Sequence, residues 1–78
     1  MKFKLAKDLV SGDVFEYNGK IEVATDGGAY MGCMWTTNEE YYIDWDNNPK
    51  GLCYGYTSAS IIEIDDNELV KVIRNMRS

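Results

Sequence analysis

Turn signals recur along the whole chain and limit how long any single element can be. They combine glycine, asparagine, aspartate and proline, and the short runs between them are rich in aromatic and β-branched residues. The signals are Ser11-Gly12-Asp13, Asn18-Gly19, Asp26-Gly27-Gly28, Thr37-Asn38 and 46–51. Closely spaced short strands are typical of an all-β barrel or sandwich. The sequence therefore predicts a mainly β fold in one small domain over residues 1–78.

The first hairpin has two plausible registers around Asn18-Gly19. A two-residue turn would pair Phe15 with Glu22 and mix polar and apolar side chains on each face. A three-residue loop ending at Gly19 pairs Phe15 with Ile21 and separates the two kinds of side chain. We therefore expect the odd-length loop, with Gly19 in the left-handed conformation.

The middle of the chain is acidic and aromatic. Between Lys20 and Lys50 there are six carboxylates, five tyrosines or tryptophans, and no basic residue. A strand over 41–45 would turn Tyr41 and Trp45 inward and leave the alternate side chains outside. A tyrosine ring flanked by carboxylates suits a Lys or Arg, through cation–π contact and charge-assisted hydrogen bonds. The predicted partner-binding residues are Tyr42, Asp44, Asp46, Glu39 and Glu40.

The same rings allow other interpretations. In so small a barrel, the rings of Trp35, Tyr41 and Trp45 could simply form the core. A small aromatic or nucleotide-like ligand could instead stack on exposed rings, as in other small barrels, and the candidate stacking residues are Trp35, Trp45 and Tyr54. Small acidic barrels with open edges also assemble, so a homo-oligomer or a structural role in a virion is a third hypothesis.

Composition excludes several classes of function. The net charge of −5 and the pI near 4.5 argue against nucleic-acid or anionic-membrane partners and favour a basic protein partner. The chain has no histidine, no P-loop and no nucleophile motif, so we expect neither an enzyme nor a cofactor. Residues 44–48 imitate the start of a calcium loop, but Pro49 replaces the glycine that such a loop needs, so we expect no metal.

The cysteines and the N-terminus indicate a reducing compartment. Cys33 and Cys53 form no metal-binding pattern, and we interpret them as small buried hydrophobic residues, with a bridge between them left open. The first residues lack the apolar run of a signal peptide, and no segment is long enough to span a membrane. A cytoplasmic location follows.

The C-terminal part allows two structures. Residues 60–65 are expected to form a strand with Ile62 and Ile64 on one face. Residues 66–76 fit a capped helix, because apolar residues recur at helical spacing. They also fit a tight turn followed by a closing strand, because Val70, Val72 and Ile73 are β-branched. We favour the turn and strand.

Two segments resemble a known group of proteins. The run 9–15, Leu-Val-Ser-Gly-Asp-Val-Phe, and the run 66–73, Asp-Asn-Glu-Leu-Val-Lys-Val-Ile, resemble the opening and ending of SH3-like small barrels. They are most similar to the small KOW-like or SH3-like proteins that bacteriophages encode. The resemblance implies a five- to six-stranded SH3-like barrel. It also implies a phage or mobile-element accessory protein that binds a host protein in the host cytoplasm and inhibits or redirects it.

Overall fold

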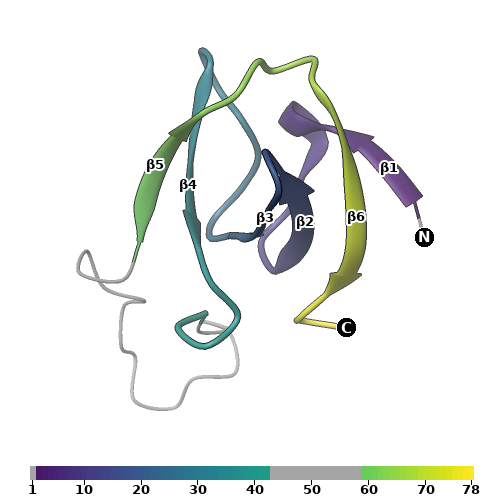
Figure 1. The fold of residues 1–78 in the computed structure, drawn as a ribbon, viewed down its shortest axis with the longest axis vertical. Helices are drawn as coiled ribbons and strands as arrows, with labels where there is room; N and C mark the ends of the chain where they lie inside the picture. Colours follow the sequence, from purple (N-terminus) through teal and green to yellow (C-terminus); the bar gives the residue numbers. More distant parts are fainter. Residues whose placement is uncertain (1, 43–58) are drawn as a thin grey trace.

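A computed structural model describes residues 2–42 and 59–78, and over these residues the protein is mainly β (Figure 1). Six antiparallel strands form one sheet in the order β1-β6-β2-β3-β4-β5. The elements are β1 (Lys2–Leu5), the 3-10 helix η1 (Ala6–Asp8), β2 (Asp13–Tyr17), β3 (Lys20–Ala24), β4 (Cys33–Thr37), β5 (Ser60–Glu63) and β6 (Leu69–Asn75). The predicted mainly β class and the expected five to six strands are confirmed for the described residues.

The sheet is curled but not closed. Within the described ranges, β1 and β5 are its two edges and no ladder joins them, and Figure 1 shows them on opposite sides of the molecule. The Tyr17 hydroxyl at the end of β2 donates a hydrogen bond of 3.2 Å to the Glu63 carbonyl of β5, across the concave side. The SH3-like barrel therefore stays a prediction, whereas the curled antiparallel sheet is observed.

The core fills the concave side of the sheet. Phe15 is fully buried and packs in one cluster with side chains from η1, from strands β3, β4 and β6 and from the segments next to these elements and β5, namely Ala6, Leu9, Ala24, Ala29, Met34, Ile64, Val70 and Val72. Gly28 allows η1 to close one end of this cluster, because a Cβ at residue 28 would lie 2.5 Å from the Ala6 carbonyl oxygen. The Ala29 N–H donates to that same oxygen at 2.9 Å.

The first hairpin has the register that we did not expect. Phe15 pairs with Glu22, and the turn has two residues, Asn18 with φ 52° and Gly19 with φ 75°. The predicted three-residue loop is wrong. Asparagine and glycine tolerate two successive left-handed conformations, and the resulting type I′ turn matches the twist of the strands. The argument from alternating side chains failed because it assumes that one face of each strand is exposed to solvent. β2 is a central strand, and its neighbouring residues Val14 and Phe15 are both buried although they point to opposite faces.

The C-terminal turn and strand are confirmed. The Asn67 N–H donates to the Asp65 carboxylate at 2.8 Å, and this turn leads into β6, which pairs with β1 on one side and β2 on the other. The C-terminal helix is therefore wrong. Ile62 and Ile64 both contact the core, as predicted for the strand over 60–65.

The middle of the chain differs from its predicted pattern. A tight turn at 30–33 precedes β4, which begins at Cys33. Cys33 and Trp35 share a face of β4 that is exposed, so the free thiol of Cys33 is exposed and its predicted burial is wrong. Tyr41 lies in a turn after β4 and is exposed, so its predicted inward position in a strand is wrong.

A buried carboxylate joins the start of β2 to β1 and the end of β6. Asp13 is 1% exposed, and it accepts hydrogen bonds from Lys4 Nζ at 2.8 Å, from Asn75 Nδ2 at 2.9 Å and from the Val10 N–H at 3.0 Å. Burial raises the pKa of Asp13, but the hydrogen bonds from Asn75, Lys4 and Val10 and the Lys4 charge outweigh burial and hold the pKa below its ordinary value. The charged form of Asp13 therefore stabilises this junction.

Candidate partner-binding surface

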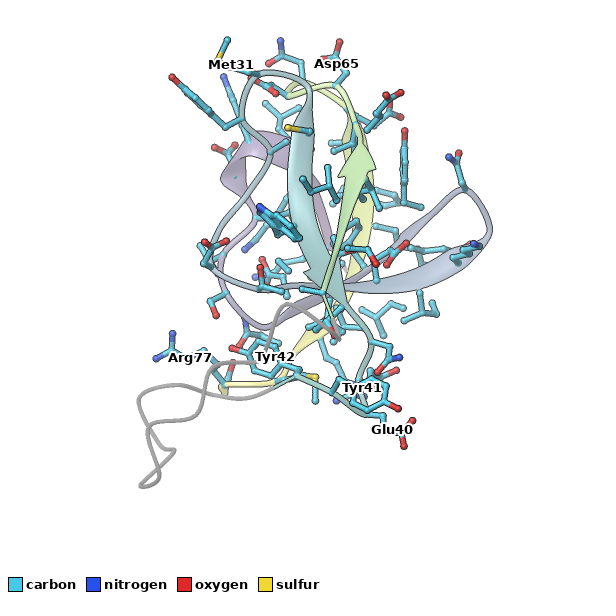
Figure 2. The ribbon with its side chains drawn as sticks, turned by 90° about the vertical axis from the view of Figure 1, so that its left-hand side faces the viewer. Met31, Glu40, Tyr41, Tyr42, Asp65 and Arg77 are labelled. Atoms are coloured by element: carbon cyan, nitrogen blue, oxygen red, sulfur yellow. The ribbon has the colours of Figure 1, made fainter. Side chains whose placement is uncertain are left out.

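The predicted partner-binding residues fall only partly within the described residues. Glu39, Glu40 and Tyr42 lie in the segment 38–42 that follows β4, and Figure 2 shows Glu40, Tyr41 and Tyr42 together at one end of the molecule. The other predicted site residues lie outside the described residues, as do Cys53 and the calcium-like segment; they are Asp44, Asp46, Trp45 and Tyr54.

Two of these predicted residues contact their own chain. The Glu39 carboxylate forms an ion pair with Arg74 of β6, and both side chains are about half exposed. The Tyr42 hydroxyl lies 2.8 Å from Ser11 Oγ, which itself donates to the Thr25 carbonyl. These contacts hold the segment 38–42 against β6 and the start of β2. Glu39 and Tyr42 therefore have structural contacts of their own, whereas Glu40 and Tyr41 face solvent.

A second surface, which the sequence did not reveal, lies on β4 and β5. Trp35 is directly opposite Ile61, and Cys33 is directly opposite Glu63, so all four side chains share the convex face of the sheet. Trp35 is 42% exposed and Ile61 is 54% exposed. We refer to Cys33, Trp35, Ile61 and Glu63 as the β4–β5 face. It combines a large ring, an aliphatic side chain and a carboxylate beside an edge strand.

The turn before β4 extends this surface. Tyr30 is 74% exposed and Met31 is 80% exposed, and the Met31 and Gly32 N–H groups donate to the Asp66 carboxylate at 3.2 and 2.9 Å. Met31 has φ 53°, a left-handed conformation that methionine rarely adopts, and the Asp66 hydrogen bonds help to hold it there. In Figure 2, Met31 lies near Asp65, at the opposite end from Tyr41. Exposed apolar or aromatic side chains thus lie before β4, at Trp35 within it, and after it.

Charge is divided between the two sides of the sheet. Residues 21–42 contain four carboxylates and residues 59–70 contain four more, and neither range contains a Lys or Arg. The cations of the described residues lie instead at the first residue of β3 and on the segments around β1 and β6, at Lys2, Lys4, Lys7, Lys20, Lys71, Arg74 and Arg77. The β4–β5 face therefore lies in the anionic half of the fold.

The hollows next to this face are polar and open. One, of about 500 Å³, is lined by Tyr17, Asn18, Lys20, Glu22, Ile62 and Glu63. A second, of about 310 Å³, adjoins it at Lys20, Glu22 and Ile62. Glu22 accepts a hydrogen bond from Thr36 Oγ1 at 3.1 Å. These mixed charges form a groove between the tip of the first hairpin and β5, without the apolar lining that small-molecule pockets usually have.

The described residues offer no group of three His, Cys, Asp or Glu side chains arranged to hold a metal ion. In the same part of the chain, no helix has the length and apolar character needed to cross a lipid bilayer.

Comparisons with known proteins found no relative. No family model matches the sequence, no curated protein matches it, and no solved structure matches it. Functional inference for this chain therefore depends on its own residues and their arrangement.

Proposed function

We propose that this protein is a non-enzymatic binding module that recognises an extended basic segment of a partner protein through the β4–β5 face. The observation that carries the proposal is the exposed Trp35–Ile61 pair on an edge-strand pair, beside Glu63, on strands from the ranges 21–42 and 59–70, which contain eight carboxylates and no Lys or Arg. Large exposed rings beside a single sign of charge favour a partner of the opposite charge.

The edge strand β5 supplies the main-chain part of this interaction. Within the described residues, β5 pairs with β4 on one side only, so its other side can accept an added strand. Side chains of the added strand that point to the convex face would lie beside Ile61 and Glu63. An Arg there would reach Glu63 through a charge-assisted hydrogen bond and the Trp35 ring through a cation–π contact.

The expected affinity is modest. An exposed cation–π contact contributes about 0.5–1 kcal/mol, and a surface ion pair contributes at most about 1 kcal/mol. Because β5 spans only Ser60–Glu63, main-chain pairing adds few hydrogen bonds. We therefore expect binding that weakens with salt and that gains strength where the partner also contacts Tyr30, Met31 or the segment 38–42.

The fold supports the same class of protein. A curled six-stranded antiparallel sheet, with the Tyr17–Glu63 contact across its concave side, is compatible with an SH3-like small barrel. The resemblance to phage-encoded small barrels makes a bacterial host protein the natural partner, held in the host cytoplasm. Binding would inhibit or redirect that protein by covering its basic segment.

A designed peptide tests the proposed surface directly. The probe is the labelled peptide Arg-Val-Arg-Val-Arg-Val, with Glu-Val-Glu-Val-Glu-Val as its charge control, and binding is followed by fluorescence anisotropy at low and high salt. We expect Glu63→Lys, which removes an ion pair and adds repulsion, to weaken binding of the basic peptide about tenfold, a change of about 1.4 kcal/mol. Trp35→Ala should weaken binding about two- to fivefold, in line with about 0.5–1 kcal/mol for the cation–π contact. Asp8→Lys makes the same charge change on η1, away from the face, and should leave binding within about twofold of wild type.

The predicted face at residues 42–46 provides the competing outcome. If the triple replacement of Tyr42, Asp44 and Asp46 by alanine abolishes peptide binding while Glu63→Lys binds normally, the β4–β5 face is the wrong surface. If both leave binding intact, the acidic half has no role in recognition. Tryptophan fluorescence against nucleotides and small aromatic compounds examines the alternative of ligand stacking, for which Trp35→Phe isolates the response of Trp45.

A further inference from the structure

The convex face of the other half carries an exposed row of side chains that runs across four strands. Phe3 of β1 is directly opposite Lys71 of β6, Lys71 is directly opposite Glu16 of β2, and Glu16 is directly opposite Ile21 of β3. Directly paired residues point to the same face of a sheet, and the neighbouring pair Val72–Phe15 points into the core. The row Phe3–Lys71–Glu16–Ile21 therefore points away from the core.

The row is apolar at both ends and charged in the middle. Phe3 is 60% exposed and Ile21 is 44% exposed, and Leu69, opposite Leu5, adds another exposed apolar side chain to the same face. The ion pairs of the described residues are Lys4–Asp13 and Arg74–Glu39, so Lys71 and Glu16 take part in neither. The row therefore offers exposed apolar side chains at its ends and two charges of opposite sign between them.

The order of the row makes it complementary to itself. A two-fold axis through its centre places Phe3 over Ile21 of a second copy, and Lys71 over Glu16 of that copy. The reverse contacts follow by symmetry, so each cation meets a carboxylate and each apolar end meets an apolar end. Isologous interfaces require this kind of self-complementarity, and two-fold dimers are the commonest oligomers. A foreign partner would need the same pattern by coincidence, whereas a second copy has it necessarily.

We infer that the convex face of β1, β6, β2 and β3 is the interface of a two-fold homodimer of this chain, with the row Phe3–Lys71–Glu16–Ile21 packed against its own copy. This interface leaves the β4–β5 face uncovered on each protomer. The dimer would therefore present two copies of the proposed partner-binding surface, and its existence does not depend on that proposal.

Charge reversal provides a test in which association is lost in each variant and restored when the two are mixed, a result that misfolding of a variant cannot produce. Lys71→Glu places two carboxylates in the middle of the row, and Glu16→Lys places two cations there. Each variant would repel its own copy, and we expect its dimer dissociation constant to rise at least tenfold in sedimentation equilibrium. Mixed in equal amounts, the two variants restore a positive pair over a negative pair, so they should form a 1:1 heterodimer of twice the 8.9 kDa chain mass.

The control substitutions lie outside the row. Lys7→Glu and Asp8→Lys make matched charge changes on η1 and should leave the wild-type mass unchanged. Should a charge variant unfold, as circular dichroism would show, Phe3→Ser and Ile21→Ser test the two ends of the row, with Val10→Ser as an exposed apolar control outside it. A wild-type chain that is monomeric at millimolar concentration, or variants that fail to associate on mixing, would overturn the inference.

Discussion

The two edges of the sheet differ in how their charges are used. On the side of β1 and β6, Lys4 is committed to the buried Asp13, which also accepts from Asn75 and the Val10 N–H. On the side of β4 and β5, Glu63 is exposed beside Trp35 and Ile61 and takes part in neither ion pair of the described residues, Lys4–Asp13 and Glu39–Arg74. The comparison teaches that Asp13 stabilises the fold, whereas Glu63 is available for a partner. Substitutions in the two halves should therefore change different measurements.

The largest effect is expected at Asp13. Asp13→Ala removes the acceptor of three hydrogen bonds and leaves Lys4 and Asn75 without their buried partner. Breaking a buried pair costs about 3–5 kcal/mol, and because Lys4 is partly exposed we expect about 3 kcal/mol here. Urea unfolding measures this loss of unfolding free energy. Glu63→Lys is the matched substitution on β5 and should change the unfolding free energy by less than about 0.5 kcal/mol. Similar losses for both variants would refute the idea that Asp13 stabilises the fold and Glu63 does not.

Acidification should weaken the same junction by a smaller amount. The pKa of Asp13 is held below its ordinary value of 3.8, so the folded state favours the charged carboxylate. The stability from this group is fully present above that ordinary value and is lost as the pH falls through the lower pKa of the folded state. Urea unfolding of wild type and Asp13→Asn from pH 6 to pH 2 should therefore show a stability difference that narrows only below about pH 4. A difference that stays constant over this range would mean that Asp13 titrates normally.

On the anionic side, the most sensitive position is Asp66. Asp66→Ala leaves the Met31 and Gly32 N–H groups to solvent and weakens the turn that presents Tyr30 and Met31. Because the site is exposed, we expect a loss of only about 1 kcal/mol in unfolding free energy. Hydrogen exchange of the β4 and β5 amides should accelerate, while exchange in β6 should follow global unfolding. Asp65→Ala, whose carboxylate caps the Asn67 N–H instead, is the matched control.

Much of the fold could be predicted from local signals. The turn segments separate strands at about the right places, and the β-branched Val70, Val72 and Ile73 correctly favoured a C-terminal strand. The register of the first hairpin could not be derived by alternation, because Val14 and Phe15 point to opposite faces of β2 and are both buried, and the turn chemistry of Asn18-Gly19 decided the pairing. A rule that assumes one solvent-exposed face along each strand fails for such residues of a central strand.

The candidate surface was harder to predict than the fold. The sequence correctly indicated that the middle of the chain is acidic and aromatic, but the pairing of Trp35 with Ile61 joins residues from distant segments. The left-handed conformation of Met31 has no sequence signal of its own, since its support comes from Asp66 across the fold. Glu39 looked like a partner-binding residue, and only the arrangement of β6 shows that Arg74 lies against it.

The smallest effect is expected where the two halves touch. The Glu39–Arg74 ion pair joins the segment after β4 to β6, but both side chains are about half exposed, so solvent screens their attraction. Glu39→Gln should lower the unfolding free energy by no more than about 0.5 kcal/mol, and 0.5 M salt should remove that difference. A double-mutant cycle with Arg74→Met isolates the pair from other contacts of either residue. A coupling free energy above about 1 kcal/mol would show that this ion pair, in addition to the shared sheet and core, holds the segment 38–42 against β6.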